Sequence, residues 1–115
     1  MKGNCHCGEI EFEVKGEPTW LGRCHCRDCQ KISGSAYMAF AEYEAENVQF
    51  TKGIPKPYKS SINVTRTFCG NCGSPIEWRR DDVPNRTSLS LGLFEGKHDF
   101  GDMDDLYEEE SPVWK

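Results

Sequence analysis

The chain has 115 residues and a net charge of −5, with 37% hydrophobic and 29% charged residues. Its length suits a single domain, and its acidic balance without a basic stripe argues against a nucleic-acid partner. No apolar run approaches the roughly 20 residues that a membrane-spanning helix needs. We therefore expect one domain over residues 1–115, with no nucleic-acid or membrane partner.

Short strands dominate the elements that the sequence predicts in chain order. Apolar and polar residues alternate at 10–14, the period of a strand with one buried face. Residues 30–32 could complete one helical turn, and residues 52–58 carry too much Gly and Pro for a central strand, which indicates a loop. Further strand-like segments lie at 36–40, 48–50, 62–68, 76–78 and 88–93. We expect an all-β or mainly β domain built from two small sheets.

The end of the chain is acidic, and we expect it to pack as an arm rather than float. This arm, residues 103–115, contains four apolar residues that could anchor it: Leu106, Tyr107, Val113 and Trp114. Just before it, His98 falls in a predicted loop and is expected to be exposed rather than functional.

Seven cysteines supplement a thin apolar core. An odd number argues against a disulfide framework, and residues 1–5 lack the apolar run of a secretory signal. We therefore expect reduced thiols in the cytoplasm, where short cysteine spacings indicate metal or redox chemistry.

One group of cysteines suggests a closed site. Cys69 and Cys72 have the spacing of a zinc knuckle, which supplies half of a tetrahedron. Cys5 and Cys7 are candidates for the other half, because alternate residues of an extended segment point the same way. Two alternatives stay open: the knuckle could pair with two cysteines of residues 24–29, or all seven thiols could be non-metallic.

The remaining three cysteines suggest an open site. Cys24, Cys26 and Cys29 can place three sulfurs around one zinc at ~2.3 Å, leaving a fourth position for water or a substrate. Three thiolates favour a soft fourth ligand such as a thiol, whose pKa zinc would lower so that it becomes a nucleophile. Three nearby cations could offset the negative charge or hold carboxylates of an anionic thiol: Arg23, Arg27 and Lys31.

Two polar residues lie between these cysteines, His25 and Asp28. His25 should project to the opposite side of an extended segment, so we do not count it as a ligand. Asp28 could be a fourth ligand or a proton acceptor, although a polar residue of a helical turn is the simpler account.

Three motifs follow one another along nearly the whole chain. They are Gly-x-Cys-x-Cys-Gly at 3–8, Cys-His-Cys-x-x-Cys-x-Lys-x-x-Gly-Ser at 24–35, and Arg-x-Phe-Cys-x-x-Cys-Gly-Ser at 66–74. Together they resemble the family of glutathione-dependent formaldehyde-activating enzymes, also called the Gfa or centromere protein V family. At residues 92–95, where that family commonly has a segment like Gly-Thr-Leu-Asp, this chain reads Gly-Leu-Phe-Glu.

The resemblance implies an Mss4-like fold, a small β-sandwich of short strands with two zinc ions. It implies a structural zinc on Cys5, Cys7, Cys69 and Cys72, and a reactive zinc on Cys24, Cys26 and Cys29. The activity it implies joins formaldehyde to glutathione, which is a carbon–sulfur lyase reaction in reverse. We therefore expect a thiol such as glutathione and a small aldehyde as partners.

Two other functions stay in consideration. A non-catalytic, zinc-stabilised binding module of the Mss4-like type would contact a protein through its β-surface. Chromatin association, suggested by the centromeric relatives, is the weakest alternative because the chain is acidic.

Overall fold

The computed structural model describes residues 1–96 and 99–115, so the expectation for His98 lies outside the described residues. The described part forms ten strands: β1 (Lys2–Asn4), β2 (Glu11–Val14), β3 (Trp20–Cys24), β4 (Met38–Glu44), β5 (Val48–Lys52), β6 (Lys56–Ser61), β7 (Val64–Phe68), β8 (Pro75–Arg80), β9 (Arg86–Ser90) and β10 (Asp104–Leu106). The helices are α1 (Arg27–Ser33) and three short 3₁₀ turns at Ala45–Asn47, Leu91–Leu93 and Glu108–Glu110. The predicted mainly β class is confirmed. None of the described helices is long and apolar enough to cross a bilayer.

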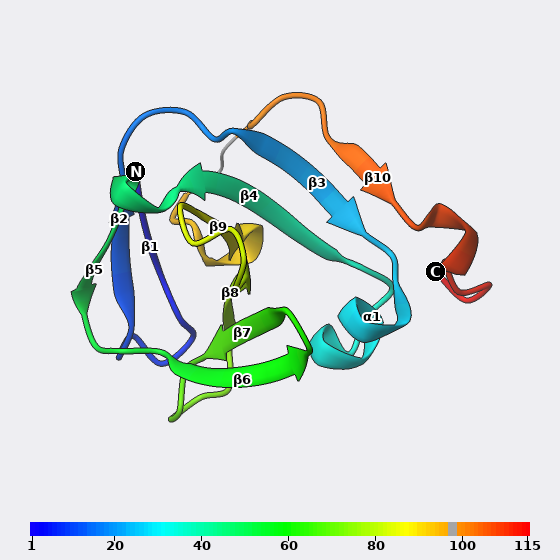
Figure 1. The fold of residues 1–115 in the computed structure, drawn as a ribbon, viewed down its shortest axis with the longest axis horizontal. Coiled ribbons are helices and arrows are strands. Elements are labelled where there is room, and N and C mark those ends of the chain that lie inside the picture. The colour runs from blue at the N-terminus through cyan, green and yellow to red at the C-terminus, as the bar shows by residue number, and fades with distance from the viewer. Residues whose placement is uncertain (97–98) are drawn as a thin grey trace.

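The strands form two sheets, as the sequence predicts, but the second is larger than expected. The small sheet has the order β1-β2-β5, and the large one has the order β10-β3-β4-β9-β8-β7-β6. Neighbouring strands are antiparallel except β10, which runs parallel to β3. Helix α1 lies beyond the end of β3, close to the end of β6 and to the C-terminal segment (Figure 1).

The core divides into two clusters of buried side chains. The larger one joins the sheets, and its largest fully buried side chains are Phe12, Tyr43, Ile76 and Leu89. Within it, the ring of Phe12 from the small sheet meets Phe94 edge-on at 5.3 Å between centroids. The smaller cluster consists of Cys24, Cys29, Met38 and Phe40. Two cysteines of the predicted open site are therefore part of a packed core.

Two boundary predictions are wrong for identifiable reasons. Residues 52–58 were expected to form a loop, but Lys56–Ser61 is strand β6. It lies at the edge of the sheet, where Pro57 can be accommodated because one side of the strand needs no backbone donor. The strand predicted from the alternation at 88–93 extends too far toward the C-terminus, because β9 ends at Ser90 and the chain then forms a 3₁₀ turn.

Strand β3 was not expected because a glycine interrupts its short apolar pattern. Gly22 pairs with Phe40 of β4, and a Cβ at Gly22 would lie 2.1 Å from Cζ2 of Trp20. The glycine therefore lets the Trp20 ring fold back over its own strand. Packing of the Trp20 ring, rather than strand propensity, explains why a glycine occupies position 22.

The acidic C-terminal arm packs against the domain, but the predicted apolar anchors are wrong. Leu106, Tyr107, Val113 and Trp114 are 40, 54, 102 and 66% exposed. Backbone and polar contacts hold the arm instead: His25 N donates to Leu106 O at 2.9 Å, and Gln30 Nε2 donates to Glu110 O at 2.9 Å. Asp105 adds an ion pair with Arg23 at 2.8 Å.

Candidate metal centres

All seven cysteines are free thiols, and they gather into two groups. Cys5, Cys7, Cys69 and Cys72 form one group, and Cys24, Cys26 and Cys29 form the other. Within each group the Sγ atoms all lie within 4.8 Å of one another. Each group could therefore hold one metal ion.

The four-cysteine group is built from two turns. Gly8 N donates to Cys5 O at 3.1 Å, and Gly73 N donates to Cys69 O at 2.8 Å. The second turn requires a positive φ, which Gly73 supplies at 79°. Cys5 and Cys7 thus meet across a turn, and the expected extended segment is not what brings them together.

The donor set of this group fits zinc. Tetrahedral zinc with sulfur at about 2.3 Å requires sulfurs about 3.8 Å apart. Cys5 and Cys7 Sγ are 3.6 Å apart, and Cys7 and Cys69 Sγ are 3.7 Å apart. The spacing therefore suits a closed tetrahedron of four soft ligands.

Uncharged donors contact three of the four sulfurs, those of Cys5, Cys69 and Cys72. Ile10 N donates to Cys5 Sγ at 3.3 Å, and Cys72 N donates to Cys69 Sγ at 3.5 Å. The hydroxyl and the backbone amide of Ser74 contribute most to lowering the pKa of Cys72, to about 5. Negative charge on the Cys72 sulfur is thus stabilised by dipoles.

The three-cysteine group lies where β3 passes into α1. Cys24 ends β3, while Cys26 caps α1 by accepting a hydrogen bond from Cys29 N at 3.4 Å. Burial raises the pKa of both Cys24 and Cys29. Three soft donors at a buried position fit a zinc ion with one coordination position left over.

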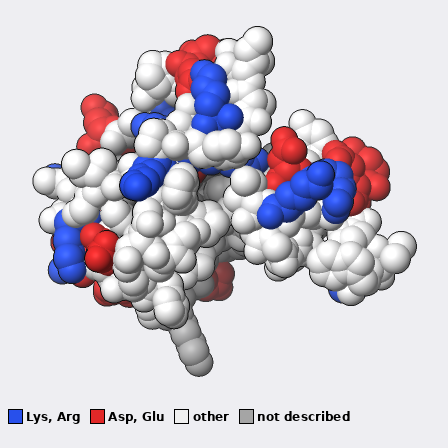
Figure 2. Space-filling model, turned by 90° about the horizontal axis from the view of Figure 1, so that it is seen from below, with Lys and Arg blue, Asp and Glu red and all other residues white. Residues whose placement is uncertain are grey.

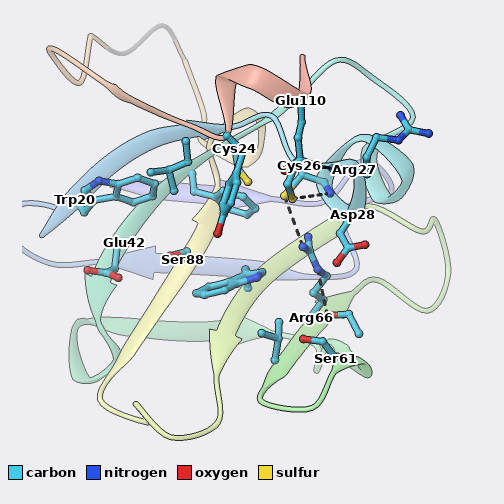
Figure 3. Close-up of a pocket in the computed structure, with 17 residues that line it drawn as sticks. Trp20, Cys24, Cys26, Arg27, Asp28, Glu42, Ser61, Arg66, Ser88 and Glu110 are labelled. Atoms are coloured by element: carbon cyan, nitrogen blue, oxygen red, sulfur yellow. Dashed lines mark hydrogen bonds between the residues drawn. The ribbon is translucent and has the colours of Figure 1, made fainter. Parts of the chain in front are cut away.

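A cavity of about 650 Å³ opens beside the three cysteines, which form part of its wall. Figure 3 shows side chains converging on it from β3, α1, β7 and the C-terminal arm. Its apolar wall includes Trp20, Phe40, Val64, Trp78, Leu106 and Tyr107. The charged groups on the wall are Arg27, Asp28, Glu42, Arg66 and Glu110. Such a cavity can hold a small organic molecule next to the sulfurs.

The cation closest to these sulfurs is Arg66, to which the sequence analysis gave no charge-compensating role. The Arg66 side chain is buried, and its Nη2 donates to Cys29 Sγ at 3.6 Å. This contact opposes the effect of burial on the pKa of Cys29. The signal available in the sequence was the position of Arg66 at the start of the third motif.

The three cations expected at the site lie elsewhere or at its margin. Arg23 pairs with Asp105 of the arm, and Lys31 is exposed on α1. Arg27 lines the cavity but is exposed, and its guanidinium donates to Gln30.

His25 and Asp28 fall outside the three-cysteine group. The buried His25 ring faces the arm, with Nε2 2.9 Å from Asp105 Oδ1 and Nδ1 3.1 Å from Ser111 Oγ. Asp28 is exposed in the first turn of α1, on the cavity wall.

Charge is mixed over the surface near this end of the molecule. On the face shown in Figure 2, Lys and Arg are interspersed with Asp and Glu among uncharged atoms.

Comparison with known proteins adds an independent result. The family model "Glutathione-dependent formaldehyde-activating enzyme" matches residues 1–110. A protein of Schizosaccharomyces pombe, described as an uncharacterized lyase, is 32% identical over 95 residues, which cover 83% of this chain and 69% of that protein.

A crystal structure of a Rhodobacter sphaeroides protein from a structural-genomics programme superposes with a TM-score of 0.74. It is 24% identical and covers 91% of this chain and 99% of its own, so it supports the fold alone. The family match spans nearly the whole chain and all three cysteine motifs. The chain therefore belongs to the glutathione-dependent formaldehyde-activating enzyme family.

Proposed function

We propose that the protein is a zinc-dependent, carbon–sulfur lyase-like enzyme acting on the adduct of a small aldehyde, such as formaldehyde, with a thiol such as glutathione. The observation that carries the proposal is the contrast between a four-cysteine group that closes a tetrahedron and a three-cysteine group beside a cavity. Family membership and the lyase relative support the same class of reaction.

Two zinc ions per chain are part of this proposal. Cys5, Cys7, Cys69 and Cys72 would hold the structural ion, and Cys24, Cys26 and Cys29 the reactive one. Zinc at the second site would supply a fourth coordination position at which a thiol gives up its proton. A reducing cytoplasm suits seven free thiols, and we propose that location.

The chain's own residues then bind, orient and shield the reactants. Trp20 and Trp78 offer apolar walls for the organic part of the thiol, while Leu106 of the arm covers one side. In the joining direction, the thiol loses its proton to solvent and its sulfur attacks the aldehyde carbon. The carbonyl oxygen takes up a proton, so a C–S bond and a hydroxyl replace the C=O double bond. The lyase direction reverses each step.

The test uses the protein with cobalt in place of zinc, because the visible spectrum of cobalt reports its thiolate ligands. Millimolar glutathione should change this spectrum, and formaldehyde with glutathione should give S-(hydroxymethyl)glutathione faster than without protein. Cys26→Ser should remove both effects. Ile62→Ser, at a position 86% exposed between β6 and β7, is the matched control and should keep both.

The alternative is a non-catalytic, zinc-stabilised binding module of the Mss4-like type. Exposed Ile54 and Ile62, on the loops that flank β6, favour it because they could meet a partner protein. If glutathione leaves both the cobalt spectrum and the thermal stability unchanged, the enzyme proposal fails and this alternative replaces it.

A further inference from the structure

Arg66 places a full positive charge in a buried position. Its side chain extends from β7 to the three-cysteine group, as Figure 3 shows. The residue is only 7% exposed, and its guanidinium donates to Ser60 Oγ at 3.3 Å, Met38 Sδ at 3.7 Å and Cys29 Sγ at 3.6 Å. Two of the three acceptors are therefore sulfur atoms.

A buried cation needs a compensating anion, because leaving it unpaired in a low-dielectric interior is costly. The ion pairs formed between residues of the described ranges, 1–96 and 99–115, do not include Arg66. Among its contacts, the Cys29 sulfur is the group that can carry negative charge. With a metal bound, the thiolates of the open site would therefore be its counter-ions.

The charge balance of the site follows from this contact. Three thiolates around a divalent ion leave about one negative charge, which repels a further anion. The Arg66 guanidinium offsets that charge, and it lies on the wall of the same cavity. A fourth ligand that arrives as an anion then meets a divalent ion, three thiolates and a guanidinium whose charges sum to about zero.

We propose that Arg66 is a specificity-determining residue that makes the three-cysteine site prefer an anionic fourth ligand over a neutral one. The class of ligand is a soft anion, and a thiolate is the member that the proposed function requires. The inference rests on the proposed function only where it names a thiolate as the ligand. The preference for anions can be measured separately, with a ligand that is not a thiol.

The experiment compares three ligands on the cobalt-substituted protein: glutathione, azide and imidazole. Dissociation constants come from changes in the visible spectrum, so no turnover is needed. Arg66→Met keeps a long side chain of similar reach without its charge, and should weaken glutathione and azide about 10- to 100-fold. Neutral imidazole should change by less than about threefold, and Arg66→Lys should restore much of the anion affinity.

Arg80→Met is the matched control, since it removes an arginine that pairs with Asp82 at the exposed end of β8. It should leave all three affinities unchanged. If Arg66→Met weakens all three ligands alike, or weakens none, the inference is overturned. Metal content and the melting curve show whether Arg66→Met folds, and Arg66→Lys keeps the charge test available if it does not.

The two proposals fail separately. If azide shows the Arg66-dependent preference but glutathione has no effect on the wild-type spectrum, the inference stands and the proposed thiol chemistry fails. If glutathione binds wild type and Arg66→Met equally well, the inference fails and the proposed function stands.

Discussion

The two cysteine groups use the same ligand atom, but their surroundings differ. Backbone amides and the Ser74 hydroxyl contact the sulfurs of Cys5, Cys69 and Cys72 in one group, whereas a buried guanidinium contacts the three-sulfur group. The first group joins two distant turns, and the second borders a cavity. The number of cysteines is therefore not the only feature in which the two candidate sites differ. The guanidinium of Arg66 and the adjacent cavity also distinguish the three-cysteine group from the four-cysteine group.

The largest expected effect separates the groups by their contribution to stability. Cys69→Ser replaces a candidate ligand that is 1% exposed and lies in a group of cysteines far apart in sequence. We expect it to lower the free energy of unfolding by more than about 4 kcal/mol, because metal-binding energy at a structural site is folding energy. Urea denaturation followed by circular dichroism measures the loss.

The matched change in the other group is Cys26→Ser. This residue is half-buried on the cavity wall and caps a single short helix, so we expect a loss below about 2 kcal/mol. Equal losses for the two variants would remove the distinction between a structural and an open group.

Metal removal should proceed in two steps. A chelator should take the ion of the three-cysteine group first, because that group borders a cavity and has one ligand fewer. We expect the first equivalent to leave without loss of the β-sheet signal and the second to leave together with unfolding. Elemental analysis and circular dichroism on the same samples check this order, which a single combined step would contradict.

The smallest expected effect concerns the arm that closes one side of the cavity. Asp105→Asn weakens contacts with Arg23 and His25, so Leu106 should cover the cavity less well. We expect a loss of about three- to fivefold in glutathione affinity, comparable with removal of a single hydrogen bond. Asp102→Asn, at an exposed position just before the arm, is the control and should leave the affinity as it is.

The contacts of Asp105 with Arg23 and His25 set a lower pH limit for the attachment of the arm. Hydrogen bonds from Arg23, first, and then His25 hold the pKa of Asp105 below its usual range. The stabilisation is therefore fully present above the ordinary carboxyl pKa, about 4, and is lost as the pH falls further. Protection of the Leu106 region against proteolysis should persist down to about pH 4 in wild type, and loss of protection near pH 6 would contradict this account.

Features with a local origin could be predicted from the sequence. Alternation over 10–14 gave β2, and short cysteine spacings gave the candidate ligands, because both patterns depend on neighbours in the chain. Strands β3 and β10 could not be predicted, since one depends on the Trp20 ring over Gly22 and the other on pairing with β3. The position of Arg66 against Cys29 joins residues 37 apart in the sequence, and no local pattern encodes it.

Strand β7 connects the two cysteine groups along the chain. It carries Arg66, which touches a sulfur of the open group, and three residues later Cys69 belongs to the closed group. Assembly of the closed group therefore fixes the segment that delivers the cation to the open one. A chain that loses the closed group should therefore also lose the placement of Arg66 beside Cys29.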